Sequence, residues 1–244
     1  QRQMCIRDSL DIVQRFSFLR ILSMTQSGVR AFVFDMDGTI VDNMPYHTQA
    51  WLQFFAETGI EMSATRLDEL MGANTTPVLL RQVLGGPVSD AQLLAYSELK
   101  EAIYRALYGP HLKPVRGLVP FLAEVQRLGI ALALATSAGR RNIEFILGGL
   151  GLGSTFDVVV SGDDVPQGKA GAEIYFATAR ELGVPPPSCL VFEDSMQGIE
   201  AAGQAGMRVV LLATSPDAAQ LCDLQPVVRT LQDFVIEPVE LLQI

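Results

Sequence analysis

Short apolar runs recur along the chain and alternate with longer stretches whose apolar residues return every three or four positions. The short runs lie at residues 31–34, 130–135, 158–160, 189–192 and 209–212. A short apolar run bounded by turn residues is typical of a strand buried on both faces of a parallel sheet. Helix-periodic stretches separate these runs, at residues 119–128, 141–148, 172–182 and 198–205. The alternation predicts an α/β fold with a doubly wound parallel sheet.

One long segment interrupts the alternation. Residues 43–114 contain no run that predicts a strand, and their apolar residues follow a helical period with breaks at Gly59, Gly72 and residues 85–87. We expect about four helices here, inserted after the first strand as a separate small domain. Open α/β sheets bind ligands at the carboxyl ends of their strands, so an insertion there is placed to act as a lid. The predicted domains are a helical cap at 43–114 and a core at 24–42 and 115–244.

The first 23 residues stand apart from this pattern. Met24 comes shortly before the first strand, where a native start is expected, so we interpret residues 1–23 as a non-native leader. The alternative is a native amphipathic N-terminal helix. Polar residues interrupt the apolar stretch at 10–24, which argues against a signal peptide. The run at 130–135 is far shorter than the roughly 20 residues of a membrane-spanning helix.

The composition is that of a folded chain with an acidic surface. Hydrophobic residues make up 49% and charged residues 18%, which supplies a sizeable core and excludes intrinsic disorder. A net charge of −9 repels phosphate backbones, so we expect no nucleic-acid partner. The chain has three cysteines, which are not spaced as metal ligands and are not the even number that a disulfide framework needs. This cysteine content fits a reducing compartment. We therefore expect a cytoplasmic protein without a membrane partner, and a monomer is favoured.

Acidic residues follow two of the predicted strands. Asp35 and Asp37 come directly after the first run, and side chains two apart on an extended segment point the same way. Two carboxylates so close repel each other unless a cation or a shared proton intervenes. Glu193 and Asp194 follow the run at 189–192. Burying two acids at the end of a strand costs free energy, which a bound hard cation would offset. Taken alone, Asp-x-Asp-Gly is also the sequence of an ordinary turn.

Two further positions suit a phosphate group. Thr136 and Ser137 end the second predicted strand, where hydroxyls and exposed backbone amides can bind a phosphate oxygen. The alternative is that one of them caps the following helix. Lys169 precedes the helix predicted at 172–182, and a loop lysine considered alone is ordinarily solvated.

The order of these motifs is more specific than any one of them. Asp-x-Asp, Thr-Ser, Lys and Glu-Asp follow one another at the ends of successive strands, with a helical insertion after the first. This order resembles the haloacid dehalogenase superfamily of phosphotransferases, which has a Rossmann-like core. The stretch at 35–42, together with His47 and Trp51, resembles the β-phosphoglucomutase-like branch of that superfamily.

The resemblance implies roles for the individual residues. Asp35 would be the nucleophile that forms an aspartyl-phosphate, and Asp37 the general acid and base. Mg²⁺ would be the cofactor, held by Asp35, the Asp37 backbone carbonyl, Asp194 and, directly or through water, Glu193. The phosphoryl group would be bound by Thr136, Ser137 and Lys169.

The chain departs from the family pattern in two places. Lys169 is followed by Ala-Gly-Ala where the family has two prolines, which predicts a looser loop around the lysine. Thr75 stands where the mutase has a cap arginine that binds a second phosphate. Lys100, on a later cap helix, is expected to face the substrate instead. His47 matches a cap-hinge histidine that helps to control proton transfer, and the alternative is a histidine on the helix surface.

These observations favour a Mg²⁺-dependent phosphatase that acts on a small phosphorylated metabolite such as a sugar phosphate. A mutase of the β-phosphoglucomutase type is the alternative, since it shares every step at the core. A phosphonatase would need a cap lysine placed for a Schiff base, which the sequence does not offer. A non-catalytic binding module on the same fold would have lost residues such as Asp35 or Asp194, and these are present.

Overall fold

The computed structural model describes residues 28–71, 76–85, 87–165, 171–242 and 244. At its centre lies a six-stranded sheet in the order β3-β2-β1-β4-β5-β6, in which each neighbouring pair of strands is parallel. The strands are β1 (Ala31–Phe34), β2 (Ala131–Thr136), β3 (Val158–Ser161), β4 (Cys189–Glu193), β5 (Arg208–Leu212) and β6 (Val227–Leu231).

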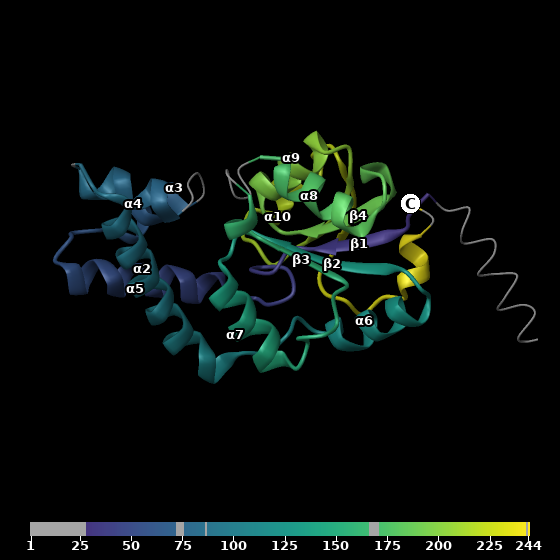
Figure 1. The fold of residues 1–244 in the computed structure, drawn as a ribbon, viewed down its shortest axis with the longest axis horizontal. Coiled ribbons are helices and arrows are strands. Elements are labelled where there is room, and N and C mark those ends of the chain that lie inside the picture. The colour runs from purple at the N-terminus through teal and green to yellow at the C-terminus, as the bar shows by residue number, and fades with distance from the viewer. Residues whose placement is uncertain (1–27, 72–75, 86, 166–170, 243) are drawn as a thin grey trace, which may run out of the picture.

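Helices cover both faces of this sheet, as a doubly wound fold requires. Figure 1 shows α6 (Leu118–Arg127) and α7 (Arg140–Leu150) below the sheet. Above it lie α8 (Glu173–Leu182), α9 (Met196–Gln204) and α10 (Ala218–Leu221). Single 3₁₀ turns lie at Gly109–His111, Gly162–Asp164, Pro186–Ser188 and Pro238–Leu241. The predicted fold class is therefore confirmed.

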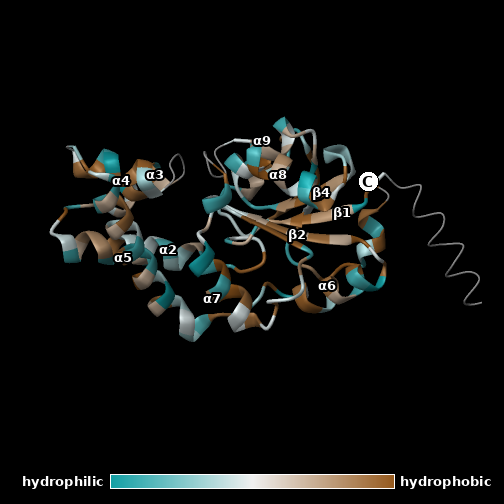
Figure 2. Cartoon of the chain, in the orientation of Figure 1, coloured by the Kyte–Doolittle hydropathy of each residue, from teal (hydrophilic) through white to brown (hydrophobic). Residues whose placement is uncertain are grey.

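The central strand β1 is apolar at every position because both of its faces are covered. Phe32 and Phe34 point into one core, which they share with Phe121 of α6. Ala31 and Val33 point into the other core, on the side of α8 and α9. All four residues of β1 are fully buried. Figure 2 shows the same feature as hydrophobic strands between helices that have both hydrophobic and hydrophilic stretches.

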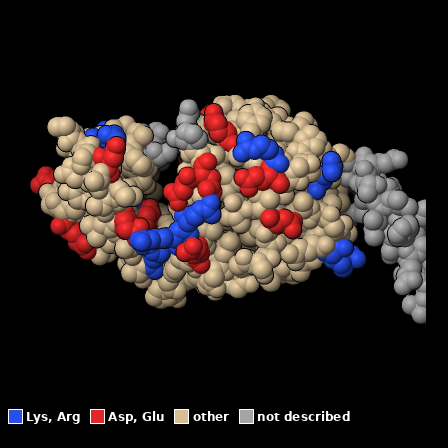
Figure 3. Space-filling model, in the orientation of Figure 1, with Lys and Arg blue, Asp and Glu red and all other residues tan. Residues whose placement is uncertain are grey.

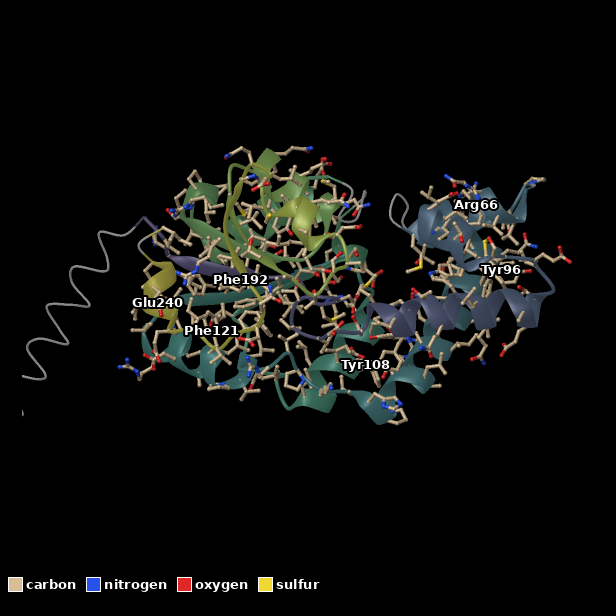
Figure 4. All side chains as sticks on the ribbon, turned by 180° about the vertical axis from the view of Figure 1, so that it is seen from behind. Arg66, Tyr96, Tyr108, Phe121, Phe192 and Glu240 are labelled. Carbon is tan, nitrogen blue, oxygen red and sulfur yellow. The ribbon has the colours of Figure 1, made fainter. Side chains whose placement is uncertain are left out.

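Aromatic rings fix the carboxyl ends of β1 and β4 against each other. The rings of Phe34 and Phe192 stack with centroids 4.4 Å apart and planes within 2°. Phe121 meets the edge of Phe192 at 5.8 Å, and both lie inside the core in Figure 4. Because Asp35 and Glu193 directly follow the stacked pair, this packing determines where their backbones lie.

A helical cap, defined here as residues 44–108, lies beyond the carboxyl ends of the strands (Figure 1). Its helices are α2 (Met44–Thr58), α3 (Ala64–Met71), α4 (Thr76–Leu84) and α5 (Asp90–Tyr108). The long helix α5 begins with a reciprocal capping box, in which Ser89 and Gln92 each accept the other's backbone N–H. Trp51, Phe54 and Phe55 of α2 are buried and form part of the interior of the cap, as their spacing predicts.

The structure adds one strand to those predicted. The edge strand β6 was not predicted, because Arg and Thr interrupt the apolar residues of its sequence, Val-Val-Arg-Thr-Leu, and leave no continuous apolar run. For the strands and helices predicted in the core, the limits agree with the observed ones to within two residues. Residues 1–23 lie outside the described residues, and none of the described helices is long and apolar enough to cross a membrane.

The aromatic packing yields a stability prediction. Replacing Phe192, which is fully buried, with alanine should lower the free energy of unfolding by about 3–5 kcal/mol, because the change leaves a cavity at the centre of the sheet. Phe176 on α8 is 47% exposed, so Phe176→Ala should change it by less than about 1 kcal/mol. Urea unfolding followed by circular dichroism measures both; equal losses in the two variants would contradict this account of the core.

Candidate active site

Three carboxylates meet at the carboxyl ends of the two central strands. Phe34 of β1 pairs with Phe192 of β4, so the residues that follow them, Asp35 and Glu193, are brought side by side. Asp35, Glu193 and Asp194 are all buried, and one oxygen from each lies within 4.8 Å of the others. Three buried negative charges repel one another strongly, and carboxylate oxygens are the ligands that hard divalent cations prefer. The cluster can therefore hold a divalent metal ion.

Glu193 is held in place by donors from its own strand end and from α8. Its Oε2 accepts the N–H groups of Asp194 (2.9 Å) and Ser195 (3.0 Å) and the Ser195 hydroxyl (3.0 Å). Its Oε1 accepts the hydroxyl of Tyr175 at 3.0 Å. A Cβ at Gly198 would lie 1.7 Å from that same Oε1, so only glycine leaves room for the carboxylate. The direction of the Glu193 side chain is thus determined by four donors and one glycine.

The turn after Asp37 wraps around Asp194. Gly38 adopts a φ of 83°, in the left-handed region, and a Cβ there would lie 2.0 Å from Asp194 Oδ2. The buried Thr39 hydroxyl donates to Asp194 Oδ1 at 3.4 Å. The first motif is therefore both a turn and one wall of the acidic cluster, and the two interpretations of Asp-x-Asp-Gly do not exclude each other.

The Asp37 side chain is outside the three-carboxylate cluster and takes its partners from the cap side. Asn43, directly before α2, donates from Nδ2 to Asp37 Oδ1 at 2.5 Å and to the Tyr104 hydroxyl of α5 at 2.6 Å. The Asn43 Oδ1 accepts the backbone N–H of Gly38 at 3.2 Å. The two aspartates of the motif thus lie in different settings, one among carboxylates and one among amide and hydroxyl groups.

His47 of α2 lies next to Asp37 and is buried, so the surface alternative for this residue is wrong. Its ring stacks on Tyr104 with centroids 3.8 Å apart, and its Nε2 lies 3.7 Å from Asp37 Oδ1. Its Nδ1 lies 2.8 Å from the ammonium nitrogen of Lys100. A lysine ammonium can only donate, so Nδ1 is the acceptor. In the neutral imidazole the proton is then on Nε2, which faces Asp37.

Lys100 is buried and packed against residues of both cap helices α2 and α5. Only 2% of it is exposed, and its ammonium points to His47 and to Glu101, whose Oε1 lies 2.9 Å away. The ammonium also lies over the rings of Trp51 (5.2 Å) and Tyr104 (5.8 Å). The charge of Lys100 therefore lies against His47, which is itself beside Asp37.

These neighbours favour the charged form of Asp37. Burial alone raises the pKa of Asp37, but His47, the Asn43 amide and the charge of Lys100 together hold it below its ordinary value. Asp37 is therefore ionised at neutral pH and able to accept a proton. Burial beside Asp37 raises the pKa of Tyr104, which keeps its hydroxyl proton.

The predicted phosphate-binding hydroxyls lie at the same edge of the sheet. Thr136 ends β2 and is buried, with its Oγ1 accepting the N–H of Ala138 at 3.2 Å. Ser137 is exposed. Helix α7 begins after Gly139 without any side-chain cap, so neither hydroxyl caps it, which removes the alternative role.

Two predicted site residues, Thr75 and Lys169, lie outside the described residues. Two residues that contact the site, Asn43 and Tyr175, were not predicted. Asn43 lies one helical turn before His47, a spacing that could have identified it, whereas nothing in the sequence pairs Tyr175 with Glu193.

Comparisons with known proteins agree with this arrangement. Residues 29–206 match the family of haloacid dehalogenase-like hydrolases. The chain is 31% identical to Protein CbbY of Rhodobacter capsulatus over 75% of this chain and 85% of that one. It is 32% identical to the phosphorylated carbohydrates phosphatase of Thermotoga maritima over 73% of this chain and 82% of that one.

A solved structure shares the fold. CbbY from Rhodobacter sphaeroides, in complex with xylulose-(1,5)bisphosphate, superposes with a TM-score of 0.74 and 26% identity, covering 84% of this chain and 95% of that one. The chain therefore belongs to the haloacid dehalogenase-like hydrolases and is an enzyme of their phosphatase and phosphotransferase kind.

Proposed function

We propose that the protein is a Mg²⁺-dependent phosphatase that hydrolyses a small phosphorylated metabolite of the sugar-phosphate class through an aspartyl-phosphate on Asp35. The observation that carries the proposal is the pairing of two differently placed aspartates. Asp35 lies among buried carboxylates that suit a cation, and Asp37 lies two residues away among proton donors of the cap. One group is thus suited to attack phosphorus and the other to move protons.

The relatives support the substrate class. The Thermotoga maritima relative is named a phosphatase of phosphorylated carbohydrates, and the CbbY structure contains a sugar bisphosphate. The proposal extends this class of substrate, small sugars with one or more phosphates, to the present chain.

In the first step a carboxylate oxygen of Asp35 attacks phosphorus. The new bond forms between that oxygen and phosphorus while the bond from phosphorus to the alcohol oxygen of the substrate breaks. Asp37 gives its proton to that leaving oxygen. The negative charge of the incoming phosphate would raise the pKa of Asp37, so that its carboxylate takes up a proton from solvent as the substrate binds and enters this step protonated.

In the second step a water molecule attacks the phosphorus of the aspartyl-phosphate. Asp37, now ionised, takes a proton from the water, and the bond between Asp35 and phosphorus breaks to release inorganic phosphate. The neighbours that lower the pKa of Asp37 favour this basic form. When phosphate leaves, its negative charge is removed, so Asp37 returns the proton to solvent and both aspartates regain their starting states.

The residues present fit a magnesium ion, because the donors are all oxygens and the three carboxylates need a counter-charge. Asp35, Glu193, Asp194 and the Asp37 backbone carbonyl would hold it. The ion would supply charge neutralisation between the carboxylates and the phosphate. Thr136, Ser137 and Lys169 would bind the remaining phosphoryl oxygens.

A phosphosugar mutase is the rival proposal, because it uses the same steps and then returns the phosphoryl group to a sugar. The sugar bisphosphate in the CbbY structure shows that a relative accommodates two phosphates. The sequence favours hydrolysis, since Thr75 offers a neutral hydroxyl where a mutase has an arginine.

The two aspartates should respond differently to the leaving group. Asp35→Asn should lower kcat by more than about 10³-fold on every phosphomonoester, because it removes the nucleophile. Asp37→Asn should lower kcat by about 10²–10⁴-fold on alkyl phosphates but much less in the phosphorylation of the enzyme by 4-nitrophenyl phosphate, whose leaving group needs no proton. Steady-state assays and quenched-flow bursts measure the two effects.

The exposed Asp42, seven residues after Asp35, supplies the matched control. Asp42→Asn should keep wild-type rates on both substrates. Wild-type turnover by Asp35→Asn would refute the covalent mechanism.

Metal binding should depend on Tyr175. Exhaustive chelation should abolish activity and Mg²⁺ should restore it, and Mg²⁺ should raise the melting temperature. Tyr175→Phe deletes one donor to Glu193, so Mg²⁺ should bind about threefold to tenfold more weakly in a calorimetric titration. Tyr96→Phe in the cap, far from the cluster in Figure 4, should bind Mg²⁺ like the wild type. Full activity after chelation would overturn the metal assignment.

Hydrolysis should exceed isomerisation. With β-glucose 1-phosphate and a bisphosphate primer, we expect more inorganic phosphate than glucose 6-phosphate, measured in parallel by phosphate detection and a coupled dehydrogenase. A charge-assisted hydrogen bond contributes roughly 1.5–3 kcal/mol, so Thr75→Arg should raise the isomerised share about tenfold or more, and Thr75→Gln, which adds no charge, should not. Isomerisation that outruns hydrolysis in the wild type would establish the mutase.

A further inference from the structure

Three hydrogen bonds between buried or half-buried polar groups, and a final 3.7 Å contact of His47 Nε2 with Asp37, join the core helix α7 to Asp37. Asn142 of α7 donates from Nδ2 to Glu101 Oε2 at 2.7 Å, and Glu101 Oε1 accepts from Lys100 at 2.9 Å. Lys100 donates to His47 Nδ1 at 2.8 Å, and His47 Nε2 lies 3.7 Å from Asp37. The line starts on the core, passes through two cap helices and ends at the proton-transfer carboxylate.

Asn142 contacts two cap residues on one face of α5. While its Nδ2 donates to Glu101, its Oδ1 accepts from Arg105 Nη1 at 2.7 Å. Glu101 and Arg105 are four residues apart, one helical turn, and so present one acceptor and one donor side by side. An asparagine amide matches this pair because its donor nitrogen and its acceptor oxygen are bonded to the same carbon. Neither aspartate nor leucine offers such a donor beside an acceptor. Asn142 is 4% exposed, so these contacts replace water almost entirely.

Glu101 connects this contact to the lysine. Burial alone raises the pKa of Glu101, but Lys100, His47 and Asn142 hold it below its ordinary value, so the carboxylate is ionised. The buried Lys100 ammonium requires this counter-charge, and the two Glu101 oxygens are divided between the lysine and the asparagine. Fixing one oxygen therefore fixes the other, and with it the direction of the lysine.

We propose that Asn142 is a positioning residue for Asp37, which acts through Glu101, Lys100 and His47 without touching the substrate. The proposal rests on the proposed function in so far as Asp37 transfers protons there. Its physical content is that the Lys100–His47 contact is correct only when the cap is seated on α7. Helix α7 begins three residues after Ser137, so the same core helix would follow the phosphate-binding loop and orient the acid.

A neighbouring pair of residues supplies the matched control. Arg141, next to Asn142, donates to Glu98 of α5 at 2.6 Å, and both side chains are largely solvated. This pair also joins core to cap, and Figure 3 shows acidic and basic side chains side by side over that junction. Glu98 also accepts from Arg105 at 2.7 Å, so this pair reaches Lys100 only through Arg105 and Asn142, and Arg141→Ala leaves the contact between Asn142 and Glu101 in place. A general strut between the two parts would involve both pairs, whereas a positioning role belongs to Asn142 alone.

The first measurement reads His47 directly and needs no activity. The chain has two histidines, His47 and His111, so ¹⁵N-histidine spectra resolve each ring, with the exposed His111 as internal reference. The wild type should show His47 with its proton on Nε2. Asn142→Ala should shift the His47 ring nitrogens toward the averaged positions of exchanging tautomers, and Arg141→Ala should leave them unchanged. An unchanged His47 in Asn142→Ala, or an equal shift in both variants, overturns the proposal.

The second measurement uses the leaving group. Asn142→Ala should lower kcat about tenfold on an alkyl phosphate with KM nearly unchanged, and alter enzyme phosphorylation by 4-nitrophenyl phosphate less than twofold. In a His47→Ala background the same change should have no further effect, because the line is already broken. Equal losses on both substrates, or additive losses in the double variant, would show a merely structural role. A wild type inactive on every phosphomonoester would instead refute the proposed function, and the His47 spectrum would still decide the inference.

A swapped pair keeps the test valid where alanine unfolds the protein. Asn142→Asp places two carboxylates face to face and should lose the alkyl phosphatase rate. Adding Glu101→Gln restores a donor–acceptor contact in the opposite direction, with the amide oxygen still available to Lys100 and the negative charge that compensates the lysine moved one contact away to residue 142, and should recover part of that rate. Failure of the pair to recover, in variants that melt like the wild type, contradicts the proposal.

Discussion

Repulsion among three carboxylates is the constraint around which the rest of the site is arranged. The parallel pairing of β1 with β4 forces Asp35 beside Glu193, and Asp194 follows at once. Such a cluster is stable only if its charges are met by donors or by a cation. The surroundings supply donors: four hold Glu193, and the Thr39 hydroxyl, in the turn that follows Gly38, donates to Asp194. The stacked pair Phe34 and Phe192 keeps the two strand ends from moving apart.

In the cap, a buried positive charge is likewise surrounded by groups that compensate it. A buried lysine is as costly as a buried carboxylate, and Lys100 is compensated by Glu101, by the histidine ring nitrogen and by the faces of two aromatic rings. Removing one member would leave the others buried without a partner, which is why such networks respond strongly to single substitutions. The side chains around Asp37 are therefore held by hydrogen bonds and ion pairs more than by apolar contacts.

Sequence reasoning predicted the parts of this enzyme that depend on one local signal. Buried strands are apolar runs, and Asp35, Thr136 and Glu193 stand directly after such runs, so their meeting at one edge follows from parallel topology alone. The cap was harder, because helical periodicity tells which residues are buried but not which helices face each other. The meeting of Lys100 with His47, 53 residues apart, depends on the crossing of α5 and α2. The roles of Tyr175 and Asn142 were missed for the same reason. Strand β6 was missed because Arg and Thr interrupt its apolar residues, unlike those of a central strand.

The two aspartates of the first motif obtain their surroundings from different halves of the molecule, Asp35 from the strands and Asp37 from α2 and α5. Evolution can therefore alter one without the other. Exchange of α3 and α4, whose described residues include no part of the polar line, would change the surface of the cap while both chemical groups stayed intact. Changes at the base of the cap would instead retune the acidity of Asp37 beside an unaltered nucleophile. In a protein built this way, the surface of the cap and the acidity of Asp37 can change in separate steps, each without disturbing the nucleophile.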